Sequence, residues 1–170
     1  IVGITKFCVH PVHFKATKTI VGGTKNVKFD KIKALQPDII ICNKEENTRE
    51  IVEELSQICP VWVTDILTIE DNLQMIHDFG QLFNKRTDAQ KWIDKINFAY
   101  QDFQQFIKVK PIKKATYFIW AKPHMVAGNH TFINELLKLT HFENIYEVKE
   151  GRYPAVELKK IRLEGDPDYV

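Results

Sequence analysis

The stretch "KFCVHPVHFK", residues 6–15, gathers one thiol and two imidazoles within six positions, at Cys8, His10 and His13. Thiolates and imidazoles bind transition metals, and a thiolate beside an imidazole can also act as a nucleophile. A closed zinc site needs a fourth ligand, usually from a second close pair, whereas the other two cysteines are 17 positions apart. Three roles therefore stay open for this stretch: a metal site, a catalytic pair, or the rim of a binding pocket.

Composition limits the classes of partner. The 170 residues, 44% of them hydrophobic, are enough for one large domain or two small lobes. The formal net charge is only +2 and both signs are interspersed, so we expect no nucleic-acid partner. No run of about 18 apolar residues predicts a membrane-spanning helix. Three cysteines cannot all pair within one chain, so a disulfide framework is not expected.

The first part of the chain alternates strand and helix patterns. Helical spacing of Phe29, Ile32 and Leu35 ends at Pro37, and "TREIVEELSQI" is a second amphipathic pattern. Short apolar runs that predict strands stand at 1–5, 19–23, 39–42 and 60–64. The run 39–42 is apolar on both faces, which is typical of a strand in the middle of a parallel sheet. The rhythm predicts an α/β lobe.

A long helical segment follows without a strand. Thr68 with Asp71, and Thr87 with Gln90, fit capping boxes that begin two helices. The second helix is expected from Asp88 to Lys108, about 30 Å long at 1.5 Å per residue. Its apolar stripe is continuous and rich in aromatic residues, which predicts a helix packed along its whole length.

The strand and helix rhythm then resumes. A strand is expected at 115–120, a helix at 131–139, a strand-like run at 144–148 and a final helix–strand unit. That last unit, "LKKIRLEGDPDYV", echoes "FDKIKALQPDIII" of the first part. We therefore expect an N-terminal α/β lobe at 1–67, a helical segment at 68–110 containing a bridging helix at about 88–108, and a C-terminal α/β lobe at 111–170.

Four segments together resemble one known family: "VGITKFCVHP", "VGGTKNVKFDKIKALQPDIIICNKEEN", "HTFINELL" and "RYPAVELKKI…DPDYV". They resemble the substrate-binding proteins of the cobalamin and ferric-siderophore ABC importers, the helical-backbone class. The resemblance covers nearly the whole chain. It implies two Rossmann-like lobes with parallel sheets, one long helix bridging them, and a ligand cleft between the lobes. Relatives carry a further strand and helix at each end, so we expect this chain to be a fragment of a longer protein.

The resemblance also assigns candidate cleft residues. His10 stands where cobalamin-binding relatives carry a cleft-lining aromatic before a proline, and Tyr153 in "RYP" is its counterpart in the second lobe. Met125 falls near another cleft-lining aromatic, and Asn43 stands where some relatives carry Trp. Trp62 and Trp120 are expected at strand carboxyl ends, where open α/β sheets bind ligands. The candidate ligand-binding residues are therefore His10, Asn43, Trp62, Trp120, Met125 and Tyr153.

Two further roles are assigned to single residues. His10 and His124 are weak candidates for metal ligands, since imidazole commonly coordinates metals. In the family, one glutamate on each lobe pairs with permease arginines. Strict alignment places these positions on Arg49 and Lys159, so the neighbouring Glu50 and Glu157 are the candidates for docking.

The few basic side chains near the candidate cleft residues limit the class of ligand. Anionic ferric siderophores usually call for several Arg or Lys side chains, and only Lys122 and Arg152 stand near the candidate cleft residues. This charge balance favours a corrinoid such as cobalamin, or another near-neutral chelate, while a ferric siderophore or haem stays open as the ligand. No intrinsic cofactor is expected.

The remaining expectations concern class and location. The chain contains no nucleophile elbow, P-loop, dinucleotide fingerprint or HExxH motif, so we expect no enzyme. The resemblance implies an ABC permease as partner, a monomeric state, and a periplasmic or externally membrane-anchored location. The alternative is a stand-alone carrier of a corrinoid or of zinc or manganese ions, without a permease and located in the cytoplasm.

Overall fold

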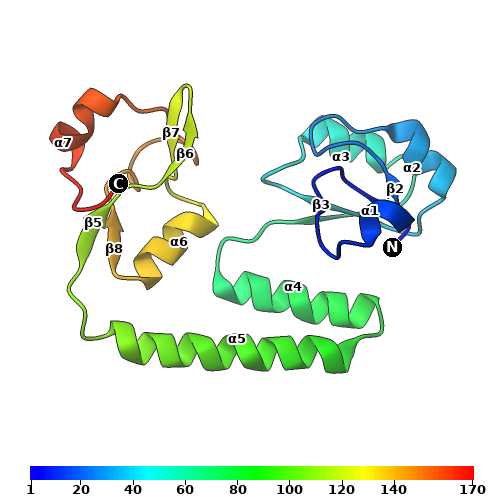
Figure 1. Ribbon diagram of the computed structural model, residues 1–170, viewed down its shortest axis with the longest axis horizontal. Coiled ribbons are helices and arrows are strands. Elements are labelled where there is room, and N and C mark those ends of the chain that lie inside the picture. Colours follow the sequence, from blue (N-terminus) through cyan, green and yellow to red (C-terminus); the bar gives the residue numbers. More distant parts are fainter. The chain divides into compact units, whose positions relative to one another are not determined.

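A computed structural model describes residues 1–170, which divide into two compact units, Ile1–Asp65 and Ile66–Val170 (Figure 1). The helical segment belongs to the second unit. None of the helices combines the length and the apolar character needed to cross a membrane.

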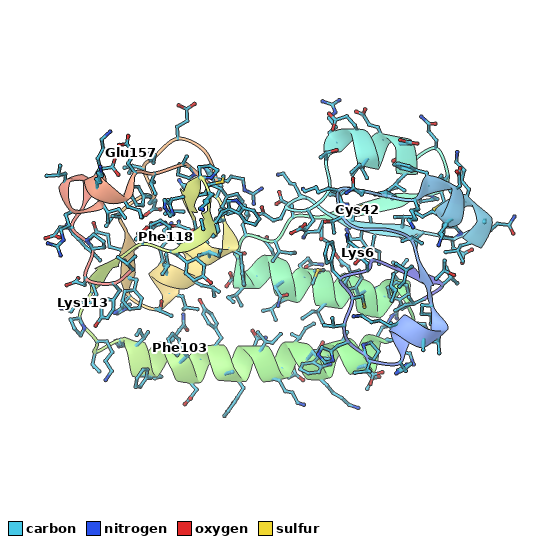
Figure 2. The ribbon with its side chains drawn as sticks, turned by 45° about the horizontal axis from the view of Figure 1, so that its top comes forward. Lys6, Cys42, Phe103, Lys113, Phe118 and Glu157 are labelled. Atoms are coloured by element: carbon cyan, nitrogen blue, oxygen red, sulfur yellow. The ribbon has the colours of Figure 1, made fainter.

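The first unit contains two pairs of parallel strands and three helices. The strands β1 (Gly3–Ile4) and β2 (Thr19–Ile20) form one pair, and β3 (Ile40–Asn43) and β4 (Val61–Thr64) form the other. The helices are α1 (Phe14–Thr17), α2 (Phe29–Leu35) and α3 (Arg49–Leu55). Ile32, Cys42 and Leu55 are the buried centre of the core, and Cys42 lies inside this unit in Figure 2. Burial raises the pKa of the Cys42 thiol, which keeps it protonated.

Strand β3 differs from its prediction. It was expected to be buried on both faces, but Ile41 is 44% exposed while the next residue, Cys42, is 5% exposed. Successive side chains of a strand point to opposite faces, so only one face of β3 packs against the core. β3 is bonded to β4 alone, at one edge, rather than lying between two partners.

The second unit begins with two helices that lie side by side, α4 (Ile69–Leu82) and α5 (Arg86–Ile107) (Figure 1). The predicted capping box at α4 is confirmed: the Asp71 backbone N–H donates to Thr68 Oγ1 over 3.0 Å, and the Thr68 N–H donates to Asp71 Oδ2 over 2.9 Å. Backbone N–H groups that donate to the Asp71 carboxylate lower its pKa.

The predicted start of α5 is wrong. The helix begins at Arg86, and its N-cap residue Lys85 makes no side-chain capping bond, so Thr87 and Gln90 lie inside the helix and form no capping box. The Lys85 N–H donates to the Gly80 carbonyl over 2.7 Å, which makes a short turn directly from α4 into α5. The 22 residues of α5 otherwise match the expected long helix.

Burial along α5 also differs from the prediction. Ala89 is the only fully buried residue of this helix. Trp92, Phe98 and Phe106 are 60%, 76% and 58% exposed. One side of α5 packs against its own unit, and the expectation that the aromatic stripe is packed along its whole length is wrong.

The rest of the second unit is mixed α/β. Strand β5 (Lys113–Ala115) pairs in parallel with β8 (Phe142–Asn144), and β6 (Phe118–Ala121) forms an antiparallel hairpin with β7 (His124–Val126). The helical elements are α6 (Phe132–Leu139), the 3₁₀ helix η1 (Leu158–Lys160) and α7 (Ile161–Glu164). The single strand expected at 115–120 is thus two strands, and the strand expected at 144–148 is a turn that follows β8. Tyr169 bridges to Ala115 in parallel, as a final helix–strand unit requires.

Candidate ligand-binding site

The β6–β7 hairpin carries two of the predicted site residues on one face. Trp120 and Met125 are cross-strand partners, so their side chains share a face. The next residue, Val126, is completely buried in the core, so Met125 and Trp120 face away from it. Trp120 is 63% exposed, and its indole N–H donates to the Lys122 carbonyl over 3.0 Å. The hairpin therefore presents a large aromatic ring, held by its own turn, to the surroundings.

An open groove of about 440 Å³ lies against this hairpin. Its lining residues are Phe118, Ile119, Trp120, Ala121, His124, Leu158 and Val170. The rings of Phe118 and His124 meet edge to face, with centroids 6.1 Å apart. No Asp, Glu, Lys or Arg side chain lines the groove. Such a surface suits a flat, largely uncharged molecule that stacks on aromatic rings.

A network of buried polar side chains fixes the loop that follows β7. The Thr131 hydroxyl donates to the Gly128 carbonyl over 2.9 Å and accepts the Asn134 N–H over 3.1 Å, which caps α6. Asn144 Nδ2 donates to Asn134 Oδ1 over 2.8 Å and to the Ala127 carbonyl over 2.9 Å. Thr131 and Asn134 have no exposed surface and Asn144 is 4% exposed. Because these groups satisfy one another away from water, they hold the loop in one conformation.

That loop positions the segment containing Tyr153. The Gly128 N–H donates to the Arg152 carbonyl over 2.8 Å, and the Val126 N–H donates to the Pro154 carbonyl over 3.1 Å. A Cβ atom on Gly128 would lie 2.8 Å from the Gly151 carbonyl oxygen, so only glycine permits this approach. Met125 also bridges to Ala155. The structure thus brings the segments of Trp120, Met125 and Tyr153 together, and Tyr153 itself is half-buried.

In the first unit, Asn43 ends β3 and is held by local hydrogen bonds. Asn43 Nδ2 donates to Thr64 Oγ1 over 3.2 Å, and Asn43 Oδ1 accepts the Glu45 N–H over 2.9 Å. Nearby, Asn47 Nδ2 donates to the Thr24 carbonyl over 3.0 Å. The amide of Asn43 therefore organises the carboxyl ends of β3 and β4 as a polar surface.

Trp62 does not lie where it was expected. It is the second residue of β4, paired with Ile41, and the strand ends at Thr64. The last residue at the carboxyl end is the buried Thr64, whose hydroxyl donates to the Cys42 carbonyl over 3.1 Å.

The "KFCVHP" stretch forms an exposed loop after β1. The Cys8 thiol donates to the backbone carbonyl of His10 over 3.3 Å, not to its imidazole, so the two side chains form no catalytic pair. His10 itself is exposed. His10 lies in the first unit and His124 in the second, and nowhere do three or more His, Cys, Asp or Glu side chains gather in a way that could hold a metal ion.

Both candidate docking glutamates lie at exposed helix starts. Glu50 is in the first turn of α3, where its own backbone N–H and the Thr48 hydroxyl lower the pKa of its carboxyl. Glu157 precedes η1 and pairs with Lys160 across 2.6 Å, with side chains 67% and 53% exposed (Figure 2). Both glutamates lie at the surface.

Sequence reasoning missed the residues that support the site. Thr131 has a readable signal, because a threonine just before an apolar helical pattern is typical of an N-cap. Asn134 also has a sequence signal, because it is a polar residue three positions after the N-cap Thr131, within the mostly apolar segment "FINELL". The partner of this amide, Asn144, follows ten positions later, and only the folded chain shows that they meet.

The chain was compared with models of known protein families. The periplasmic binding protein family model matches residues 1–170, the whole chain. The chain belongs to this family.

Individual relatives are distant. The vitamin B12-binding protein of Vibrio parahaemolyticus is 24% identical over 149 residues, covering 83% of this chain and 52% of that protein. YvrC of Bacillus subtilis, an uncharacterized ABC transporter substrate-binding lipoprotein, is 24% identical over 181 residues, covering 98% of this chain and 55% of that protein. The chain therefore spans about half the length of these relatives.

Solved structures of other proteins share the fold. The periplasmic vitamin B12-binding protein of Vibrio cholerae matches with a TM-score of 0.86 and 18% identity, over 96% of this chain and 64% of that one. The haem complex of Staphylococcus aureus IsdE matches with a TM-score of 0.78 and 20% identity, over 95% and 63%. Together with the parallel strand pairs and the long helix, these likenesses confirm the expected α/β fold class.

Proposed function

We propose that this chain is part of the substrate-binding component of an ABC importer, which captures a metal chelate and delivers it to a permease. Membership of the periplasmic binding protein family supports a binding role rather than a catalytic one. Two sequence relatives carry names that fit this role: one is a vitamin B12-binding protein and the other an ABC transporter substrate-binding lipoprotein.

The observation that carries the proposal is the apolar groove at the β6–β7 hairpin. Trp120 is 63% exposed, and no Asp, Glu, Lys or Arg side chain lines the groove beside it, so this surface is costly to leave in water unless something covers it. A planar, mostly apolar macrocycle would stack on Trp120 and cover the groove.

The ligand class follows from the same lining. Haem carboxylates and anionic siderophores require cationic partners, and no Lys or Arg side chain lines the groove. We therefore favour a corrinoid such as cobalamin, or another near-neutral chelate. His124, which also lines the groove, would contact such a ligand through its imidazole.

The other candidate residues complete the proposed site. Met125 and Tyr153 would extend the wall that Trp120 begins, since their segments are hydrogen-bonded neighbours. His10, Asn43 and Trp62 are the candidate ligand-binding residues of the first unit.

Docking to a permease would use the exposed glutamates. Glu50 and Glu157 would pair with basic residues of the permease. Glu157 would give up its exposed ion pair with Lys160 to form the new one. The proposed location is outside the cytoplasmic membrane, either in a periplasm or on a membrane anchor.

Two single-tryptophan variants test this proposal. We expect Trp120→Ala to weaken binding of cyanocobalamin about 5- to 30-fold, the scale of a lost stacking contact. Trp92→Ala is the matched control, because Trp92 is similarly exposed but lies on α5, away from the hairpin. Affinities measured by calorimetry for cyanocobalamin, haemin, a ferric siderophore and zinc would rank the ligand classes. Equal losses in both variants would remove the hairpin from the site, and tight zinc binding alone would favour a metal-ion carrier.

A further inference from the structure

Positive charge is concentrated at the start of the first unit. Residues 1–33 contain seven lysines and one acidic residue, Asp30. The rest of the chain carries more acidic than basic side chains, so the small net charge of +2 hides this segregation. The two signs are therefore not interspersed in this segment, unlike the chain as a whole. The lysines are Lys6, Lys15, Lys18, Lys25, Lys28, Lys31 and Lys33.

Five of these lysines gather beside α2. An open hollow of about 470 Å³ lies along this helix (Figure 1). The lysines that line the hollow are Lys28, Lys31 and Lys33. Lys25 stands in the turn just before them, and Lys6 reaches the same turn, because a Cβ atom on Gly23 would lie 3.3 Å from Lys6 Cε. We call these five residues the basic surface.

The charges of the basic surface are not neutralised within the chain. All five lysines are exposed, and none makes an ion pair. Asp30 and Glu54 also border the hollow but pair with none of them. Burying an ammonium group without a counter-charge is costly. This surface therefore meets either water or an anionic partner.

We propose that the basic surface docks the first unit on a membrane that carries anionic phospholipids. Phosphate oxygens of one headgroup would accept hydrogen bonds from the lysines around the hollow. Lys6 and Lys25 would meet neighbouring headgroups.

The type of cation favours lipid over a folded acidic partner. The basic surface contains lysine and no arginine. The planar fork of arginine suits partners whose carboxylates or phosphates are fixed in place, whereas an ammonium group on a flexible stem follows groups that move. Headgroups in a fluid bilayer move in this way.

The strength of the contact comes from several weak attractions. Each lysine near an anionic membrane strengthens binding about fivefold, and the attraction is screened beyond about 8 Å at physiological salt. The basic surface includes none of the candidate ligand-binding residues and neither candidate docking glutamate. Failure of this proposal would therefore leave the proposed function intact, and the reverse also holds.

Co-sedimentation of the purified protein with lipid vesicles tests the proposal. We expect binding to phosphatidylcholine vesicles that contain about 30% phosphatidylglycerol, and none to pure phosphatidylcholine. Raising NaCl from about 0.1 M to about 0.5 M should release the wild-type protein, because salt screens the attraction.

Charge variants locate the binding surface. Combining Lys28→Glu, Lys31→Glu and Lys33→Glu should lower the partition coefficient at least about a hundredfold, since each lysine contributes about fivefold. The corresponding triple change to Arg keeps the charge and should bind like the wild type. The matched control combines Lys108→Glu, Lys110→Glu and Lys114→Glu, three exposed lysines of the second unit without ion pairs. It changes the net charge equally and should lower the partition coefficient less than about tenfold. Circular dichroism of each variant checks that the fold is kept.

Three results would overturn the proposal. Wild-type protein that ignores phosphatidylglycerol, or binds pure phosphatidylcholine equally well, does not recognise anionic lipid. Retention on immobilised polyglutamate without any binding to vesicles would make the partner an acidic protein. A control variant that loses as much binding as the Lys28, Lys31 and Lys33 variant would show that net charge, rather than this surface, carries the attraction.

Discussion

At the scale of single residues, the pair of buried amides at Asn134 and Asn144 determines where the ligand-binding loop lies. Asn144 is the donor to both Asn134 Oδ1 and the Ala127 carbonyl. We predict that Asn144→Ala lowers the free energy of unfolding by about 1–3 kcal/mol, because both acceptors stay buried without a donor. Urea denaturation measures this loss. Asn26→Ala, at an exposed turn position, is the control and should change the same quantity by less than about 0.5 kcal/mol. Equal effects would mean that the amide network contributes nothing.

His10 and Tyr153 are the residues through which the family resemblance makes its sharpest claim about the site. We predict that His10→Ala and Tyr153→Ala each weaken ligand binding by about 1–2 kcal/mol, the scale of a lost aromatic contact. Thermal unfolding should change little for His10→Ala, because His10 is exposed. A metal site predicts something else: loss of zinc binding in His10→Ala and none in Tyr153→Ala. Unchanged affinity of both variants for every chelate would make "KFCVHP" a structural loop.

At the scale of elements, the contact between α4 and α5 depends on one glycine. A Cβ atom on Gly80 would lie 2.5 Å from the Cβ of Ala89, the buried residue of α5. Alanine normally stabilises a helix interior relative to glycine by about 1 kcal/mol. Here we predict the opposite sign, with Gly80→Ala destabilising by roughly 1–3 kcal/mol, because the clash outweighs helix propensity. Adding Ala89→Gly should recover part of the loss in the same denaturation assay. A stabilising Gly80→Ala would show that the helices pack less closely.

Helices were predicted well where local signals suffice. The capping box of Thr68 and Asp71 predicted the start of α4, and the helix expected at 131–139 is α6, Phe132–Leu139. The start of α5 could not be predicted, because the turn from Gly80 to Lys85 continues directly into it and outcompetes the local Thr87 signal.

Strands were predicted less well, because tertiary pairing sets their ends. The run "ATYFIW" reads as one strand, but Ala115 pairs with Asn144 while Phe118 pairs with Val126, so the chain changes partner between them. Asn144 also accepts the Tyr146 N–H over 3.1 Å, which turns the chain at the point where a longer strand was expected. The groove has the same origin: Trp120 and Leu158 both line it but are far apart in sequence, so no local pattern predicts it.

At the scale of the whole molecule, the order of strands and helices and the family motifs were enough to predict the α/β class and the family, which the match over residues 1–170 confirms. The proposed function goes further than fold class and family, because it names a metal chelate as the ligand. It rests on the exposed indole of Trp120 and on the groove of the second unit, which no Asp, Glu, Lys or Arg side chain lines.

Calorimetric titration of the purified protein with cyanocobalamin tests this account most directly. We predict saturable binding of one molecule per chain, weakened by Trp120→Ala and by Tyr153→Ala but not by Trp92→Ala, with haemin and a ferric siderophore binding more weakly. The reason is the lining of the groove, which offers aromatic surface and no Lys or Arg side chain. Tighter binding of an anionic siderophore than of cyanocobalamin, or cyanocobalamin binding that ignores Trp120, would contradict the account.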